Sequence, residues 1–181
     1  MGYAGGTRPR RPTYESIGDH TEVFQVDFDP ELISYEALLE RFWASHDPTS
    51  PPWSTQYRNL ILVADAEQRR VAVASRARQA EKLGKQVLTP LEDLTTFTRA
   101  EDYHQKFVLR QYKDVLADLR RTHPGEAFVD TTAAARLNAY LSGYGEAERL
   151  EADLERFALS DGAADTVRRR FTGRKAMRCG N

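Results

Sequence analysis

Residues 20–28 alternate in the way that is typical of a β-strand: His20-Thr21-Glu22-Val23-Phe24-Gln25-Val26-Asp27-Phe28. Every second residue from His20 shares one face, and that face carries Glu22 together with Phe24, Val26 and Phe28. Asp29-Pro30 ends the strand. The pattern therefore places one carboxyl group, that of Glu22, among large apolar side chains.

Helices and strands are predicted on both sides of this strand. A glycine-rich stretch, 1–19, precedes it, and a helix capped by Ser34 follows it. Further on we predict strands at 57–64, 85–89 and 93–98, a helix from Asp65 to Gly84 with a capping box at Gln68, a helix at 101–121, short helices at 131–141, 146–158 and 161–171, and a basic tail from Arg168. The fold class expected is α+β.

Length and composition indicate one globular domain with a helical appendage. The chain has 181 residues, 40% hydrophobic and 29% charged, with a net charge of -1. A near-neutral charge favours neither nucleic acid nor an acidic ligand, and no apolar run approaches the roughly 20 residues that span a bilayer. No export signal is present and Cys179 is the one cysteine, so we expect a reducing, cytoplasmic setting.

Glu22 is the strongest candidate for chemistry. A carboxyl group on an apolar face loses hydration, which favours its protonated form, and a protonated carboxyl group acts as a general acid. The alternative is that Glu22 lies at the mouth of the strand, in contact with water. His20 either positions Glu22 or a substrate, or forms a hydrogen bond to loop backbone. Tyr3, Tyr14 and Tyr57 either donate hydrogen bonds to a polar ligand or pack at a rim.

Other chemistry-bearing residues have simpler alternatives. Arg174, Lys175 and Arg178 near Cys179 favour its thiolate, yet the cysteine is equally readable as an incidental terminal residue. The cluster 168–170 either contacts phosphate or forms a solvated helix end. The acids of 101–104 either serve a site or complement a helix dipole. No His or acid spacing suits a metal.

Several motifs occur in an order that resembles one family: Gly2-Tyr3-Ala4-Gly5-Gly6, Pro12-Thr13-Tyr14, His20-Thr21-Glu22, Ile33-Ser34-Tyr35-Glu36-Ala37-Leu38-Leu39, Phe42-Trp43-Ala44-Ser45-His46-Asp47-Pro48, Thr55-Gln56-Tyr57-Arg58 and Ala100-Glu101-Asp102-Tyr103-His104-Gln105. Their sequence and spacing resemble peptide-methionine (S)-S-oxide reductase, the A-type methionine sulfoxide reductase. The resemblance covers about residues 1–110. The stretch 130–138 resembles an extension found in one branch of the family.

The resemblance implies a two-layer, ferredoxin-like α+β core with a mixed sheet at 1–123 and a helical extension at 124–181. It implies that a cysteine or selenocysteine attacks the sulfoxide sulfur of oxidised proteins or free methionine sulfoxide, while an acid at Glu22 protonates the departing oxygen. Tyr14 and Tyr57 match the tyrosines that bind this oxygen. His20, Trp53 and Tyr3 are the expected substrate contacts. No bound cofactor is implied, and thioredoxin or a dithiol is the external reductant.

The chain departs from the family pattern in three places. The Gly-Cys-Phe-Trp motif that carries the nucleophile is absent, so we expect a preceding segment to be missing and the 181 residues to be inactive. Pro51-Pro52-Trp53-Ser54 replaces an Asn-Asp-x-Gly stretch, and Cys179 is left as the one candidate for a resolving thiol. Our hypothesis for the loss is a selenocysteine codon read as a stop, with a restart at a GTG codon read as Met1. A Gly-UGA-Phe-Trp reading frame in the upstream DNA is the corresponding expectation.

Two functions follow. The first is reduction of methionine S-sulfoxide, and the alternative is a non-catalytic relative that binds methionine sulfoxide, or a gene fragment. The loss of a central strand predicts an exposed groove beside Glu22, with neighbouring backbone groups unpaired. Binding to nucleic acid through the arginine-rich tail is a weaker third class.

Overall fold

The computed structural model describes residues 1–7 and 11–179, with side chains through Arg174. The chain divides into two compact units, Met1–Ala100 and Glu101–Asn181. This division precedes the boundary predicted between residues 123 and 124, because the helices that follow Glu101 pack with the helices near the C-terminus.

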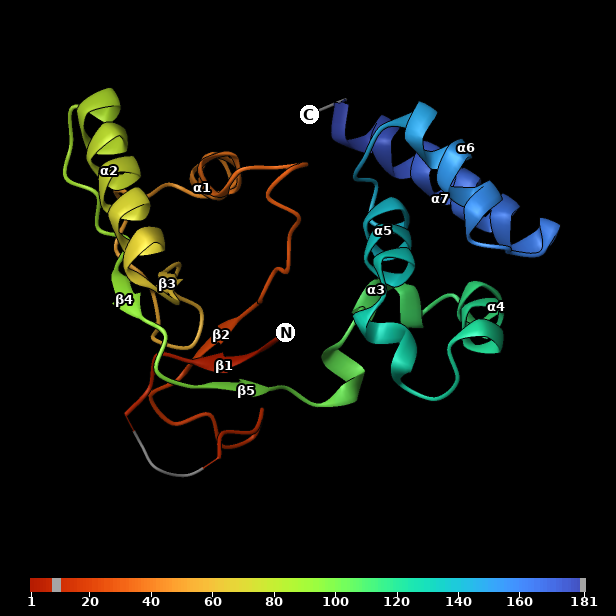
Figure 1. The fold of residues 1–181 in the computed structure, drawn as a ribbon, viewed down its shortest axis with the longest axis horizontal. Helices are drawn as coiled ribbons and strands as arrows, with labels where there is room; N and C mark the ends of the chain where they lie inside the picture. Colours follow the sequence, from red (N-terminus) through yellow and green to blue (C-terminus); the bar gives the residue numbers. More distant parts are fainter. Residues whose placement is uncertain (8–10, 180–181) are drawn as a thin grey trace. The chain divides into compact units, whose positions relative to one another are not determined.

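The first unit contains two small sheets (Figure 1). In one sheet β1 (Gly2–Ala4) lies between β2 (Thr21–Val23) and β5 (Phe97–Arg99), and both pairings are antiparallel. In the other sheet β3 (Ile61–Val63) pairs in parallel with β4 (Leu91–Asp93). The α+β class is thus confirmed, with the antiparallel and parallel pairings in separate sheets.

The strand predicted at 20–28 is shorter in the structure. Only Thr21–Val23 pair, because β1 offers three residues as partners. Residues 24–28 have no strand partner among the described residues, and the Phe24 side chain is 73% exposed. The alternating pattern is therefore present without the neighbouring strand that would stabilise it.

Two further strand predictions were wrong in detail. Residues 85–89 form no strand; the backbone N–H of Leu88 instead donates to the carbonyl of Pro48, over 2.8 Å. The strand predicted at 93–98 is two strands, because β4 belongs to the parallel sheet and β5 to the antiparallel sheet. The chain crosses from one sheet to the other between them.

Local capping signals set the two helices of the first unit, and the predicted N-cap of each helix is confirmed. α1 (Tyr35–Trp43) begins at Ser34, whose hydroxyl accepts from the Ala37 N–H. α2 (Ala66–Leu83) begins at Asp65, which accepts from the Gln68 N–H, and ends at Gly84 in the left-handed region with φ 60°. The Gln68 side chain accepts from the Ala64 N–H, one residue before the cap, so only the Asp65 half of the predicted capping box forms. The helices pack on β3 through a common core of Leu39, Trp43, Ile61, Val63, Val71 and Ala72.

The second unit is helical. The helix predicted at 101–121 is broken into η1 (Asp102–His104), α3 (Phe107–Arg110) and α4 (Lys113–Thr122), because Lys106 takes a left-handed conformation with φ 52°. After η2 (Ala127–Asp130) come α5 (Thr132–Leu141), α6 (Ala147–Arg156) and α7 (Asp161–Cys179). The last helix runs past its predicted end at Phe171, since Gly173 does not interrupt it.

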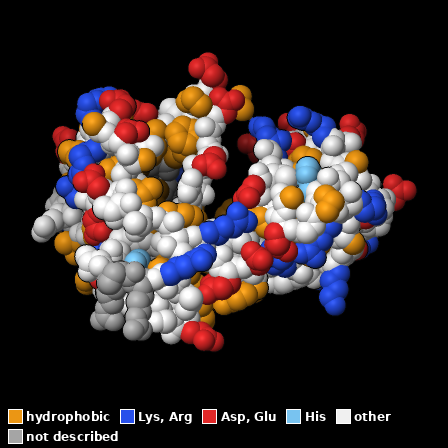
Figure 2. Space-filling view, turned by 60° about the horizontal axis from the view of Figure 1, so that its bottom comes forward, with side chains coloured by type: hydrophobic (Ala, Val, Ile, Leu, Met, Phe, Trp, Pro, Cys, Tyr) orange, Lys and Arg blue, Asp and Glu red, His pale blue; other side chains and the backbone are white. Residues whose placement is uncertain are grey.

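Two carboxylates, one buried and one half-buried, tie the helices of this unit together around an apolar core. Asp118 accepts from the backbone N–H and the hydroxyl of Ser160, the residue directly before α7. Glu126 forms ion pairs with Arg110 and Arg120, and both guanidinium groups lie over the Phe128 ring, at 5.0 and 5.2 Å from its centroid. Charged side chains of both signs are interspersed on the face in Figure 2.

These carboxylates predict a pH dependence of stability. The hydrogen bond from the Ser160 hydroxyl lowers the pKa of Asp118, so its folded pKa lies below its unfolded pKa. The stabilisation is therefore fully present above the ordinary carboxyl pKa of about 4 and is lost as pH falls through the folded pKa. We expect Asp118→Asn to cost about 1 kcal/mol near pH 7, and this cost to shrink between about pH 4 and 2.

Urea unfolding followed by circular dichroism at several pH values measures this difference. Glu155→Gln is the matched control, because the Glu155 carboxyl group is exposed and has no ion pair or hydrogen bond with another described residue. A cost of Asp118→Asn that stays constant down to pH 2 would contradict the prediction.

Candidate active site

An open groove lies beside Glu22. Its cavity, of about 790 Å³, is lined by residues 22–28, by one side of α1 and by residues 58–62. We call it the β2–β3 groove. Most of its surface is apolar, and residues 24–28 border it without a strand partner among the described residues. The sequence predicted a groove at this place, and the structure contains one.

Glu22 lies at one end of the groove, half-buried in β2 opposite Tyr3 of β1. Its backbone N–H donates to the carbonyl of Gln56 over 2.9 Å. Its carboxyl oxygen Oε1 accepts from Gln56 Nε2 over 2.7 Å. The other oxygen, Oε2, has no hydrogen-bond partner among the described residues, so it is the oxygen that is open to a ligand.

The two predicted catalytic tyrosines lie with this carboxyl group. Gln56 Nε2 also donates to the phenol oxygen of Tyr57, over 3.0 Å, and Tyr57 is hydrogen bonded to Tyr14. Partial desolvation, and then the charge of Glu22, raises the pKa of Tyr57, so its phenol keeps its proton at neutral pH and can donate. The structure thus links Glu22 and Tyr57 through the Gln56 side chain, and Tyr14 joins them through Tyr57.

Trp53 provides an exposed aromatic surface next to this cluster. Its ring stacks on Tyr57 with the centroids 5.1 Å apart and the planes at 23°, and the side chain is 80% exposed.

A turn at Asp47 precedes Trp53 in the chain. The Ser50 hydroxyl and the Thr49 backbone and side chain donate to the Asp47 carboxylate and lower its pKa to about 2. Trp53 and Tyr57 also border a smaller cavity of about 220 Å³.

Residues to which the sequence assigned no role support the cluster. Arg58 Nε donates to the hydroxyl of Thr21, which donates in turn to the carbonyl of Thr55. The Arg58 guanidinium also forms a two-point ion pair with Glu92, at 2.8 and 3.1 Å, on β4. Gln56 and Arg58 both lie in the motif 55–58, and this motif is the sequence feature that could have identified them. Only Tyr57 was singled out from it, because the contacts of its neighbours are not local.

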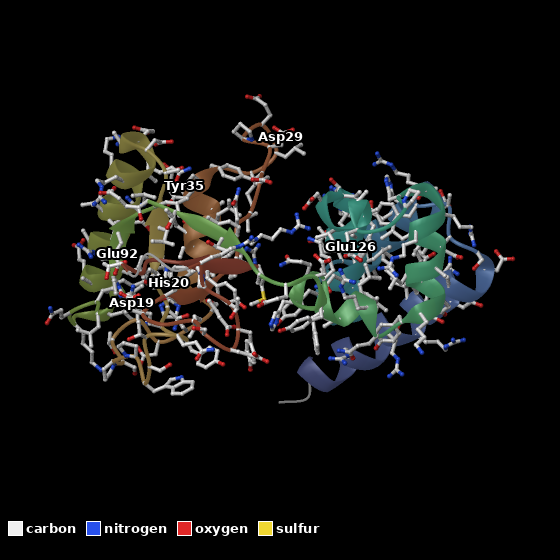
Figure 3. The ribbon with its side chains drawn as sticks, turned by 90° about the horizontal axis from the view of Figure 1, so that it is seen from below. Asp19, His20, Asp29, Tyr35, Glu92 and Glu126 are labelled. Carbon is white, nitrogen blue, oxygen red and sulfur yellow. The ribbon has the colours of Figure 1, made fainter. Side chains whose placement is uncertain are left out.

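His20 and Tyr3, two of the predicted substrate contacts, are both buried. His20 is buried, and its Nδ1 donates to the carbonyl of Ile17 over 3.0 Å, which corresponds to the alternative with a backbone partner. Its ring packs so closely on Gly6 that a Cβ there would meet the ring at 2.5 Å. Figure 3 shows it beside Asp19, 3.7 Å away. Tyr3 is almost fully buried in β1.

Cys179 ends α7, but its side chain lies outside the described residues. Among the described residues, no group of three or more His, Cys, Asp or Glu side chains is placed to hold a metal ion. In the same part of the chain, no helix combines the length and the apolarity needed to cross a membrane.

Comparison with known proteins gives consistent matches. The sequence model of the family described as "Peptide methionine sulfoxide reductase" matches residues 1–136. A Drosophila melanogaster protein named "Peptide methionine sulfoxide reductase" is 38% identical over 162 residues, which are 88% of this chain and 65% of that protein. "Peptide methionine sulfoxide reductase A5" from Oryza sativa subsp. japonica is 40% identical over 146 residues, covering 77% of this chain and 57% of the rice protein.

A shorter relative matches as well. "Peptide methionine sulfoxide reductase MsrA" from Methanoculleus marisnigri is 40% identical over 122 residues, which are 61% of this chain and 74% of that protein. The chain thus spans less than two-thirds of the length of the fly and rice relatives.

Proposed function

The chain belongs to the peptide methionine sulfoxide reductase family, and we propose that its Glu22 site acts in the reduction of methionine S-sulfoxide, free or in oxidised proteins, to methionine. One observation carries the proposal. The Glu22 carboxyl group and the Tyr57 phenol accept from the same Gln56 nitrogen, at 2.7 and 3.0 Å, with Tyr14 hydrogen bonded to Tyr57. Glu22 also lines the apolar β2–β3 groove, and Tyr57 borders the smaller cavity beside Trp53.

The arrangement suits a sulfoxide chemically. The sulfoxide oxygen is a strong acceptor, and the Tyr14 and Tyr57 phenols are the donors that would hold it. Glu22 would give this oxygen its proton from Oε2, while Oε1 stays bound to Gln56. The exposed face of Trp53 would contact the apolar part of the methionine side chain.

The reaction requires a thiolate or selenolate. This group attacks the sulfoxide sulfur and bonds to it, and the S–O bond breaks as Glu22 protonates the oxygen, which leaves as hydroxide. The hydroxide, or a water molecule that loses a proton, then bonds to the nucleophile; the bond between the nucleophile and the methionine sulfur breaks, methionine leaves, and the nucleophile becomes a sulfenic or selenenic acid. A second thiol then displaces water and forms a disulfide or selenosulfide. A dithiol such as that of thioredoxin reduces this bond and is itself oxidised. Cys179 is the one cysteine of the chain, and we propose it as a resolving thiol.

The nucleophile would arrive on an extended segment that occupies the β2–β3 groove. Residues 24–28 keep a strand pattern without a partner among the described residues, and the exposed Phe24 side chain borders the groove. A strand between them and β3 would join the two small sheets into one mixed sheet. The core at 1–123 would then be a two-layer, ferredoxin-like fold, with 124–181 as its helical extension. The setting we propose is cytoplasmic.

The 181-residue polypeptide is therefore expected to show no catalytic turnover of methionine S-sulfoxide with dithiothreitol or thioredoxin. An extended synthetic peptide containing Gly-Cys-Phe-Trp is expected to bind in the groove and start turnover, measured as methionine released. The same peptide with serine for cysteine is the matched control and should bind without turnover. Steady reduction by the polypeptide alone, surviving Cys179→Ser, would contradict the proposal.

A second candidate function follows from the same site. The hydrogen-bonded cluster is complete while the one cysteine of the chain lies in the last three residues, and this favours a non-catalytic relative that binds methionine sulfoxide. Calorimetric binding of methionine S-sulfoxide, with no turnover even when the peptide occupies the groove, would favour this candidate or a gene fragment over the reductase.

A further inference from the structure

We propose that Gln56 is the positioning residue of this site: its single side-chain amide holds the Glu22 carboxyl group and the Tyr57 phenol in a fixed relation. The inference rests on the proposed function, which gives Glu22 and Tyr57 their roles. A carboxamide nitrogen carries two hydrogens that diverge in one plane, and here each has its own acceptor. The contact with Glu22 Oε1 fixes which end of the amide faces the pair, since the carbonyl end would repel a carboxylate oxygen, and the Tyr57 phenol oxygen accepts the second hydrogen.

The backbone of Gln56 is fixed independently of its side chain. Its carbonyl accepts from the Glu22 N–H, and the neighbouring Thr55 carbonyl accepts from the Thr21 hydroxyl. Arg58 Nε donates to the same Thr21 hydroxyl. The stretch 55–58 is thereby attached to β2 at three points, so the Gln56 amide projects from a defined position towards the carboxyl group.

In this geometry the two carboxyl oxygens of Glu22 have different roles: one accepts a hydrogen bond, and the other carries the proton. Oε1 is occupied as an acceptor, so a proton on Glu22 resides on Oε2, which has no partner among the described residues. A carboxyl group without this contact would rotate about its last side-chain bonds and spread its proton over both oxygens and many directions. Gln56 would therefore act through Glu22 and Tyr57, without touching the substrate.

A double-mutant cycle read out at Tyr57 tests this role without any turnover. The charge of Glu22 contributes to the raised pKa of Tyr57, so Glu22→Gln is expected to lower the pKa of Tyr57. If Gln56 holds the carboxyl group near the phenol, this effect should shrink to about half or less in a Gln56→Leu background. The titration is followed by NMR with tyrosine labelled at Cζ, and Tyr57→Phe assigns the signal.

Gln86→Leu is the matched control, because Gln86 is an exposed glutamine with no hydrogen bond to another described residue. In that background Glu22→Gln should keep its full effect. An effect of equal size in the Gln56→Leu and Gln86→Leu backgrounds would overturn the proposal. Since no catalysis is measured, this result is distinct from a failure of the proposed reductase activity.

A second measurement needs no substitution at Gln56 and covers the case in which Gln56→Leu does not fold. The two side-chain amide protons of Gln56 have separate acceptors, so Glu22→Gln should shift one proton resonance and Tyr57→Phe the other. Both resonances staying unchanged in both variants would show that the amide does not bridge the two groups.

Discussion

Glu22→Gln is expected to lower kcat by about 10²–10⁴-fold in the protein whose groove holds the nucleophile segment. Glutamine keeps the size of the side chain and an oxygen that can still accept from Gln56 Nε2, but it has no acidic proton for the departing oxygen. The oxygen would then leave as a poorly stabilised anion. Because the proton is transferred in the transition state, kcat and kcat/KM should fall together.

The measurement is methionine release against substrate concentration, with the nucleophile peptide at saturation. Glu31→Gln is the matched control: Glu31 lies in the exposed loop before α1, and its side chain has no hydrogen bond with another described residue. A Glu22→Gln protein within about threefold of the parent kcat would remove Glu22 as the acid, since general acid catalysis contributes far more than this.

Phe128→Ala is expected to destabilise the helical unit by about 3–5 kcal/mol. The Phe128 ring is fully buried in the core of this unit and lies under the guanidinium groups of Arg110 and Arg120. Truncation leaves a cavity that the surrounding helices fill only in part. It also removes the aromatic face from two arginines that pair with Glu126.

Urea unfolding of Phe128→Ala should show an earlier transition for the helical unit. Phe107→Ala supplies the same chemical change at an exposed position of α3 and should cost less than about 1 kcal/mol. Equal costs for the two variants would contradict the burial of Phe128 as the dominant cause.

Local signals correctly predicted where α1 begins and where α2 begins and ends, whereas α1 ends at Trp43, before the predicted stop at His46-Asp47-Pro48. Ser34, Asp65 with Gln68, and Gly84 act within one turn of their own positions, so the sequence contains everything that these caps need. Strand lengths depend on partners far along the chain. Residues 24–28 carry the alternating pattern of a strand but lack a strand partner among the described residues. The alternation alone therefore predicted too great a length for β2.

The part of the candidate site that lies in recognisable local motifs could be predicted from the sequence. The family resemblance singled out Glu22, Tyr14 and Tyr57, and the structure brings them together. Gln56 escaped notice because its contact with Glu22 joins positions that are 34 residues apart. Nothing in the alternation of residues 20–28 reports such a pairing. The break at Lys106 was missed for a related reason, since a lysine seldom takes a left-handed conformation.

The placement of the two tryptophans gives this chain separate optical signals. Trp43 is buried in the core of the first unit, where its indole donates to Ser75, whereas Trp53 lies in solvent against Tyr57. Light emitted by Trp43 reports whether the unit is folded. Light emitted by Trp53 responds to whatever displaces water from the aromatic stack. A spectrofluorimeter can therefore follow occupancy of the site in unlabelled protein, with the integrity of the fold monitored in the same cuvette.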